Sequence, residues 1–161
     1  MKRCALIAIA LCVAGCGDSS PANVAGDYTL SLTNHENGCN FQTWTVGETT
    51  QGLPFTIVQN GTAVTGVIGG VAGDWVRLIL GSDAFAGSVD GQALHLVLNG
   101  TRAYTEGGCT YTIIGTADAE LAGDVLAGSI VYTTATNGSP DCGALAGCES
   151  IQVFNGTRPP P

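Results

Sequence analysis

The sequence predicts an all-β protein, built as an antiparallel up-and-down barrel of about eight to ten strands, with a β-sandwich as the alternative. No helical period is sustained beyond the N-terminal segment, while β-branched and aromatic residues alternate between turn signals. Single glycines also recur inside predicted strands, at Gly66, Gly87, Gly115 and Gly128. Because an interior glycine weakens a strand, this recurrence indicates bends or close approaches in a tightly coiled sheet.

Ten segments are predicted as strands: Tyr28–Thr33, Phe41–Val46, Pro54–Gln59, Thr62–Ile68, Asp74–Leu80, Ala84–Val89, Gln92–Leu98, Cys109–Leu121, Val125–Thr134 and Glu149–Asn155. Asn60-Gly61 and Asp90-Gly91 each lie between two apolar runs, which is typical of two-residue hairpins with positive φ. Residues 117–126 contain helix-favouring Ala, Glu and Leu, but interrupting glycines favour a long hairpin there.

The first residues have the pattern of an export signal. Met1-Lys2-Arg3 is basic, Cys4–Val13 is apolar, and Val13-Ala14-Gly15-Cys16 places small residues before a cysteine. The segment resembles a bacterial lipoprotein signal peptide with its lipobox. That resemblance implies cleavage before Cys16, lipid on the Cys16 thiol and N-terminus, and anchoring in the bacterial cell envelope. Gly17 after the cysteine favours the outer membrane, on its periplasmic or surface face.

This processing divides the chain into four parts. Residues 1–15 are the cleaved signal peptide, 16–25 the lipidated cysteine and a polar tether, 26–158 a single β-barrel domain, and 159–161 a proline tail. Removing Lys2 and Arg3 leaves three basic residues against 13 acidic ones, so the formal charge changes from −8 to −10. Phosphate binding needs clustered Lys or Arg, so the sequence predicts no nucleic-acid partner.

Cysteine usage points to disulfides. The chain has 7 cysteines; Cys4 and Cys12 leave with the signal and Cys16 carries lipid, so four remain for the domain. They are Cys39, Cys109, Cys142 and Cys148. An even number in an oxidising compartment predicts two disulfides, whereas a zinc site would favour closer Cys-x-x-Cys pairs.

Strand parity places all four cysteines at one end of the barrel. With an even number of up-and-down strands, that end lies opposite the tether. The pairing Cys39–Cys148 with Cys109–Cys142 is favoured because each joins neighbouring strands, while Cys142–Cys148 with Cys39–Cys109 stays open. The same end carries the long connections 34–40, 99–108 and 135–148, so these distal loops are the predicted binding face.

A second resemblance concerns the two ends of the domain. Gly26-Asp27-Tyr28 opens the first strand, and Arg158 follows the last one. This arrangement resembles the lipocalin opening Gly-x-aromatic and its closing arginine, with Tyr in place of the usual Trp. A lipocalin-like barrel would bring Arg158 beside Tyr28, which gives Gly26, Tyr28 and Arg158 structural roles.

The domain offers little catalytic chemistry. His35 lies in a predicted loop, and His95 alternates with Leu94 and Leu96, so it faces solvent or a cavity. Asp118, Glu120 and Asp124 form an acidic turn that lacks the dense, regularly spaced oxygen ligands of a calcium site. We therefore expect no enzyme activity, no catalytic residue, no metal and no cofactor.

The expected function is binding. Candidate ligand-binding residues are Trp75, Arg77, His95 and Tyr104. The sequence predicts a lipid-anchored envelope lipoprotein that binds a small apolar ligand or a protein partner through its distal loops. The alternative is a structural or surface lipoprotein with a solid core and no ligand. A pocket in the barrel would favour the first hypothesis, and a filled core the second.

Overall fold

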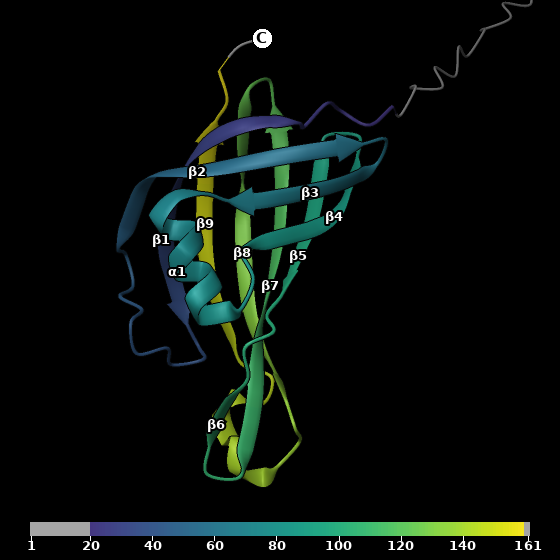
Figure 1. Ribbon diagram of the computed structural model, residues 1–161. Coiled ribbons are helices and arrows are strands. Elements are labelled where there is room, and N and C mark those ends of the chain that lie inside the picture. The colour runs from purple at the N-terminus through teal and green to yellow at the C-terminus, as the bar shows by residue number, and fades with distance from the viewer. Residues whose placement is uncertain (1–19, 160–161) are drawn as a thin grey trace, which may run out of the picture.

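A computed structural model describes residues 20–159, which form nine strands and two helices (Figure 1). The strands are β1 (Gly26–Asn37), β2 (Thr49–Asn60), β3 (Ala63–Ile68), β4 (Ala84–Asp90), β5 (Ala93–Asn99), β6 (Tyr104–Glu106), β7 (Cys109–Ala122), β8 (Val125–Thr136) and β9 (Glu149–Thr157). The helices are α1 (Gly70–Leu80) and the 3-10 helix η1 (Pro140–Leu145). The lipobox and Cys16 lie outside the described residues, so that prediction is not addressed.

Eight strands close into an antiparallel barrel. Their order around the barrel is β1, β2, β3, β4, β5, β7, β8 and β9, and β9 pairs with β1 to complete the circle. The ninth strand, β6, pairs with the first residues of β7 and lies outside the circle. The predicted antiparallel barrel is therefore confirmed, and the sandwich alternative is not the observed fold.

Two predicted strands are wrong. The segment 41–46 lies in the loop between β1 and β2, where the backbone forms successive turns closed by Trp44 N–H to Phe41 C=O and Glu48 N–H to Thr45 C=O. The segment 74–80 belongs to α1. Its side chains are apolar at every position except Asp74 and Arg77, a pattern that suits a helix as well as a strand, so the sequence does not distinguish the two. The two errors remove a pair of strands, so the number of barrel strands stays even and the predicted direction of every strand after residue 80 holds. The segments 54–59 and 62–68, which lie between the two errors, run opposite to the prediction, because β2 is antiparallel to β1.

The hairpins form where the turn chemistry placed them. Gly61 has φ of 62° and joins β2 to β3, and Gly91 has φ of 55° and joins β4 to β5. Gly123, with φ of 63°, turns β7 into β8, so the long hairpin across 117–126 is also confirmed.

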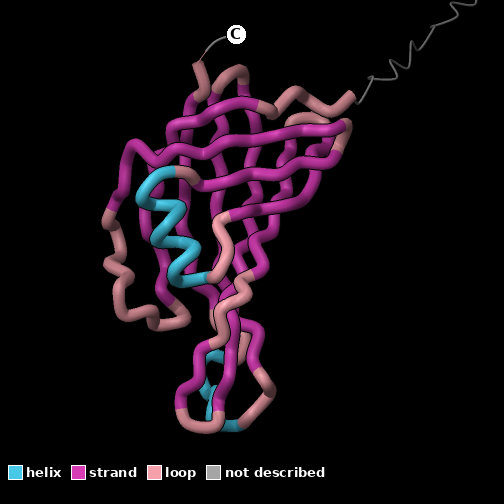
Figure 2. Tube along the Cα trace, in the orientation of Figure 1, coloured by secondary structure: helices cyan, strands magenta, loops and turns pink. Residues whose placement is uncertain are grey.

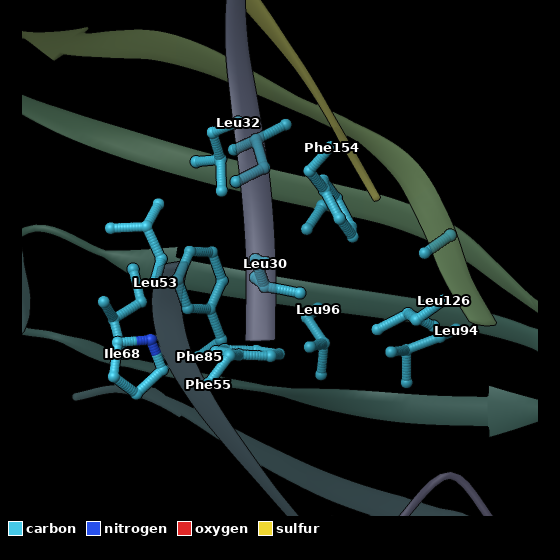
Figure 3. Close-up of a pocket in the computed structure, with 14 residues that line it drawn as sticks. Leu30, Leu32, Leu53, Phe55, Ile68, Phe85, Leu94, Leu96, Leu126 and Phe154 are labelled. Carbon is cyan, nitrogen blue, oxygen red and sulfur yellow. The ribbon is translucent and has the colours of Figure 1, made fainter. Parts of the chain in front are cut away.

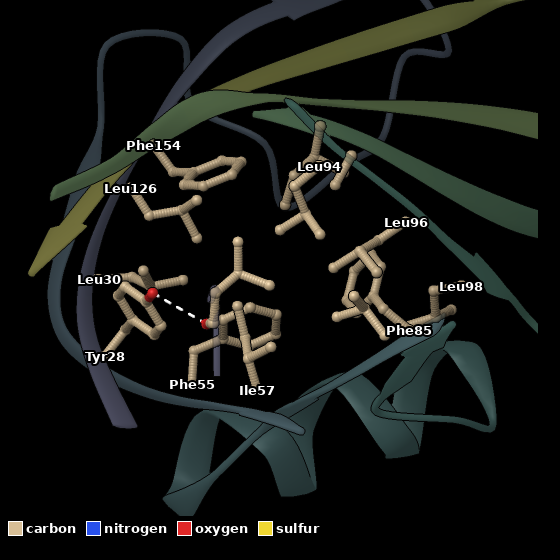
Figure 4. Close-up of a cluster of buried hydrophobic side chains, with 14 of the residues drawn as sticks. Tyr28, Leu30, Phe55, Ile57, Phe85, Leu94, Leu96, Leu98, Leu126 and Phe154 are labelled. Carbon is tan, nitrogen blue, oxygen red and sulfur yellow. Dashed lines mark hydrogen bonds between the residues drawn. The ribbon is translucent and has the colours of Figure 1, made fainter. Parts of the chain in front are cut away.

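Inward side chains from all eight barrel strands form one core (Figure 4). Leu94, Leu96 and Leu98 on β5 are buried, as their shared strand phase predicts. The strand glycines make room for this core: a Cβ at Gly66 would overlap the ring of Phe55. The close approach expected from the glycine pattern is therefore present.

The end of the barrel where β1 begins is closed by the chain that precedes it. Val24 is fully buried, and its carbonyl accepts a hydrogen bond of 3.0 Å from Tyr28 Oη. The Arg158 guanidinium lies 5.8 Å from the centre of the Tyr28 ring and pairs with Asp124 at 3.0 Å. Burial raises the pKa of Tyr28, with Arg158 acting against it. The predicted meeting of Tyr28 and Arg158 is confirmed.

The opposite end carries both disulfides. Cys39–Cys148 and Cys109–Cys142 form as favoured, with Cα atoms 4.9 and 4.8 Å apart. Beyond this end a narrow arm extends from the barrel, built from β6, the start of β7 and the segment that contains η1 (Figures 1 and 2). The helix α1 lies between this arm and β3, beside the loop that joins β1 to β2 (Figure 2). We call this end of the barrel the mouth. Neither helix of the described region has the length and apolar character needed to span a bilayer.

Candidate ligand groove at the barrel mouth

The barrel interior is a packed core. The side chains that meet at its centre, among them Leu30, Phe55, Phe85 and Leu96, leave a void of about 30 Å³ (Figure 3). This void is apolar throughout and offers no hydrogen-bond partner to a water molecule. Small-molecule sites occupy roughly 300–1,000 Å³, so the interior has no room for a ligand of that kind.

A larger concave site lies at the mouth, between α1 and the loop 41–48. This groove has a volume of about 460 Å³. Its lining includes six of the ten aromatic residues of the chain: Phe41, Trp44, Trp75, Tyr104, Tyr111 and Tyr132. The fold therefore places most of its aromatic surface in one site and uses smaller aliphatic side chains for much of the core.

The helix wall of the groove is held at its C-terminal end. The last carbonyls of a helix have no hydrogen-bond donors within the helix. Here the segment after β5 supplies those donors. Backbone N–H groups of Thr101 and Arg102 donate to Leu80 C=O, and Tyr104 Oη donates to Ile79 C=O at 2.7 Å. Leu80 is buried in the core, so α1 is fixed while its Trp75 side chain stays about half exposed at the groove.

The loop wall of the groove is held by Asn37 and by the Cys39–Cys148 disulfide. The Asn37 side chain donates to Phe41 C=O at 3.0 Å and accepts from Phe41 N–H at 2.8 Å. These two hydrogen bonds fix the backbone at Phe41. The next aromatic residue, Trp44, makes a T-shaped contact with Tyr132, with ring centres 5.8 Å apart. The indole N–H of Trp44 is buried and has no partner among the described residues.

A polar chain runs along the same wall. Tyr132 Oη donates to Gln152 Oε1 at 2.9 Å, and Gln152 Nε2 donates to Asn34 Oδ1 at 2.7 Å. Asn34 Nδ2 in turn donates to Thr45 C=O at 3.1 Å. Desolvation raises the pKa of Tyr132 well above its ordinary value, so its hydroxyl stays protonated and keeps its role as a donor. The groove wall is therefore hydrogen-bonded as well as aromatic.

The structure separates the four predicted ligand-binding residues. Trp75 and Tyr104 line the groove. Arg77 lies on the exposed side of α1 and pairs with Asp74 and Asp83. His95 lies on the outer face of the barrel, where its Nδ1 is 2.7 Å from Asp118 Oδ1 across the β5–β7 pair. Only two of the four candidates therefore share a site.

Sequence reasoning missed four groove residues. Phe41 and Trp44 lie in the predicted strand 41–46, which does not form, and the alternating pattern of their segments predicts Tyr111 and Tyr132 as core residues. A usable signal was present, because these residues lie within four residues of the predicted distal connections 34–40, 99–108 and 135–148. Among residues 20–159, no three His, Cys, Asp or Glu side chains are grouped so that they could hold a metal ion.

Fold and site define a closed, eight-stranded antiparallel β-barrel with a filled interior, a disulfide-stapled mouth and an aromatic groove there. This architecture is consistent with the lipocalin-like barrel that the Gly26, Tyr28 and Arg158 pattern implied. In comparisons with known proteins, no family model, no curated protein and no solved structure matches this chain. Function is therefore inferred from the groove itself.

Proposed function

We propose that this protein is a lipid-anchored envelope lipoprotein that binds a small, largely apolar ligand in the mouth groove without transforming it. The observation that carries the proposal is the contrast between a filled interior and a mouth groove of about 460 Å³ lined by six aromatic side chains. Aromatic-lined clefts of this size are typical of small-ligand sites. The lining contains no His, Lys, Arg or Cys, which supports binding rather than catalysis.

Chain geometry supports an orientation for the anchored protein. Val24 packs into the closed end of the barrel, and Ala22 N–H already donates to Gly91 C=O at 2.7 Å. The few residues between Cys16 and this packed segment span at most ~20 Å when extended. Lipid on Cys16 would therefore hold the closed end close to the bilayer and direct the groove away from it, toward the periplasm or the exterior.

The groove is tested with a chain that starts after Cys16, secreted into an oxidising compartment and studied without detergent. Within the described part of the chain, the contacts that close the barrel lie between residues 22 and 158, so this form retains them. Binding of the uncharged probe N-phenyl-1-naphthylamine is measured by fluorescence titration and calorimetry. We expect one saturable site, together with a change in tryptophan emission, because Trp44 and Trp75 are the two tryptophans of the chain and both line the groove.

A matched pair of variants on α1 assigns that binding to the groove. Ala72→Phe adds a ring to a residue that lines the groove, so it should weaken probe binding at least about tenfold. Val71→Phe adds the same ring to the neighbouring residue, which is 86% exposed and outside the groove, and should leave binding unchanged. Equal effects of the two variants, or no probe binding to the wild-type chain, would refute the groove as the ligand site.

The anchor has its own test. A Cys16→Ser variant of the full chain should move from the membrane fraction to the soluble fraction or retain its signal segment. A cleaved Cys16→Ser protein that stays with the membrane would contradict lipid anchoring.

The filled interior favours a second function, that of a structural or surface lipoprotein without a ligand. Native mass spectrometry of the domain purified from its source distinguishes the two. A bound small molecule that is released by Ala72→Phe supports the ligand-binding proposal. A bare chain that also fails to bind the uncharged probe supports the structural one.

A further inference from the structure

Positive charge is scarce in this molecule and is kept out of the groove. After Lys2 and Arg3, the chain has three basic residues besides its histidines, namely Arg77, Arg102 and Arg158. None of them lines the groove, and neither histidine does. Arg77 is engaged by Asp74 and Asp83, and Arg158 is paired with Asp124 at the closed end. An anionic head group in the groove would therefore meet no lining cation.

The groove instead presents negative charge and aromatic faces. Glu48 is the carboxylate in its lining, and the molecule as a whole carries a formal charge of −8. Aromatic faces attract cations through the ring quadrupole. The structure contains one such contact on a lining residue, because the Arg102 guanidinium, which does not itself line the groove, lies 5.8 Å from the centre of the Tyr104 ring.

A second group of rings on the other wall is arranged to receive a cation. Phe41 and Trp44 have ring centres 6.1 Å apart, and Trp44 lies 5.8 Å from Tyr132 at an interplanar angle of 82°. All three rings line the groove, so they present a shared aromatic surface to a ligand there. Among the described residues, no arginine of this chain lies over this group.

We propose that the groove selects amphiphiles with a cationic ammonium head over those with a carboxylate head. This inference rests on the proposed ligand-binding function and names the chemical class of its ligand. The apolar part of the ligand packs against α1, and the ammonium group lies near Glu48 and the ring group of Phe41, Trp44 and Tyr132. Electrostatics supplies selectivity here, while the apolar part supplies most of the binding free energy.

The test uses three probes that share one decyl chain: decyltrimethylammonium, decyldimethylamine N-oxide at pH 8, where it is uncharged, and decanoate. Each is titrated by calorimetry below its critical micelle concentration into the chain that starts after Cys16. We expect the ammonium probe to bind about tenfold more tightly than decanoate, with the N-oxide between them.

Two carboxylate variants separate the groove from the overall charge of the protein. Glu48→Gln should reduce the preference for ammonium over decanoate about threefold or more. Glu36→Gln removes the same charge from an exposed residue on β1 outside the groove and should leave the preference unchanged. Equal effects of the two variants would overturn the inference, because the preference would then come from net charge.

The outcomes distinguish this inference from the function on which it rests. Equal binding of all three probes, or tighter binding of decanoate, overturns charge selectivity and leaves the ligand site in place. If Ala72→Phe leaves the affinity for the ammonium probe unchanged, the probe binds outside the groove through its attraction to the charged surface, and the inference is overturned. Failure of all three probes to bind overturns the ligand site and its selectivity together.

Discussion

Replacement of Gly66 by alanine tests whether the core needs the close approach that this glycine permits. Gly66 lies on β3 with its missing side chain directed inward, where a Cβ would overlap the tip of the Phe55 ring. The φ angle of Gly66 is not in the left-handed region, so alanine adds no backbone strain. A steric conflict between one methyl group and one ring is therefore isolated from other effects.

The magnitude follows from how far the Phe55 ring can move. The ring is 6% exposed and packs edge-on against Phe85 with centres 6.2 Å apart. The neighbouring void of about 30 Å³ can relieve part of the overlap. Overpacking a core typically costs about 1–3 kcal/mol, and we expect Gly66→Ala to reduce the free energy of unfolding by an amount in this range.

A double-mutant cycle assigns the loss to this contact. Phe55→Leu removes the ring tip, so Gly66→Ala should cost at least about 1 kcal/mol less in that background. Gly115→Ala is a milder control, because the nearest atom to its Cβ is a Tyr132 ring carbon at 3.3 Å. Unfolding is followed in guanidinium chloride with the disulfides intact. If Gly66→Ala is as stable as the wild type, or costs the same with Leu at position 55, the close-approach argument is refuted.

Three further predictions concern the closed end, the staple and alkaline pH. Arg158→Ala removes the contacts with Tyr28 and Asp124 and should lower the free energy of unfolding by about 2 kcal/mol. Arg77→Ala, at an exposed ion pair, should lower it by less than about 0.5 kcal/mol. Equal losses for the two variants in chemical denaturation would contradict this prediction. Cys39 and Cys148 are 109 residues apart, so their disulfide closes a long loop in the unfolded chain. Replacing both by alanine should lower the free energy of unfolding by about 4–5 kcal/mol in the same assay, because the unfolded chain gains conformational entropy. A loss below about 1 kcal/mol would show that this entropy gain is small. Burial raises the pKa of Tyr132, so the unfolded chain loses this proton first and the contribution of Tyr132 to stability should be constant below about pH 10 and fall above it. Tyr28 and Tyr111, whose pKa values burial also raises, add to this fall, so Tyr132→Phe should make it shallower without abolishing it. Identical slopes would exclude the Tyr132 hydroxyl as a cause.

Local turn chemistry made the barrel predictable. Gly61, Gly91 and Gly123 have positive φ where the sequence places turns, because few other residues adopt that backbone without strain. Once the turns and an even strand number are known, the ends of the strands follow. The favoured cysteine pairing depends on the same reasoning, since Cys39 and Cys148 are then on neighbouring strand ends, and the structure selects it over the pairing Cys142–Cys148 with Cys39–Cys109.

The groove was far less predictable, because its walls form through long-range contacts. Trp75 lies in a segment that is apolar apart from Asp74 and Arg77, so strand and helix periods fit the segment equally well. Its helical state depends on partners for the α1 carbonyls that come from residues 101–104, and on burial of Leu80.

By itself, then, the amino-acid sequence favoured an antiparallel barrel over a sandwich and predicted its turns, the four disulfide cysteines and the meeting of Tyr28 with Arg158, because each depends on backbone φ preferences, strand parity or residues at strand ends. Only the tertiary structure decided that the interior is solid and that six aromatic residues from separate segments line one groove at the mouth. A void and a groove are properties of how side chains from distant segments fill a common space, and no local pattern records how much of that space is left over.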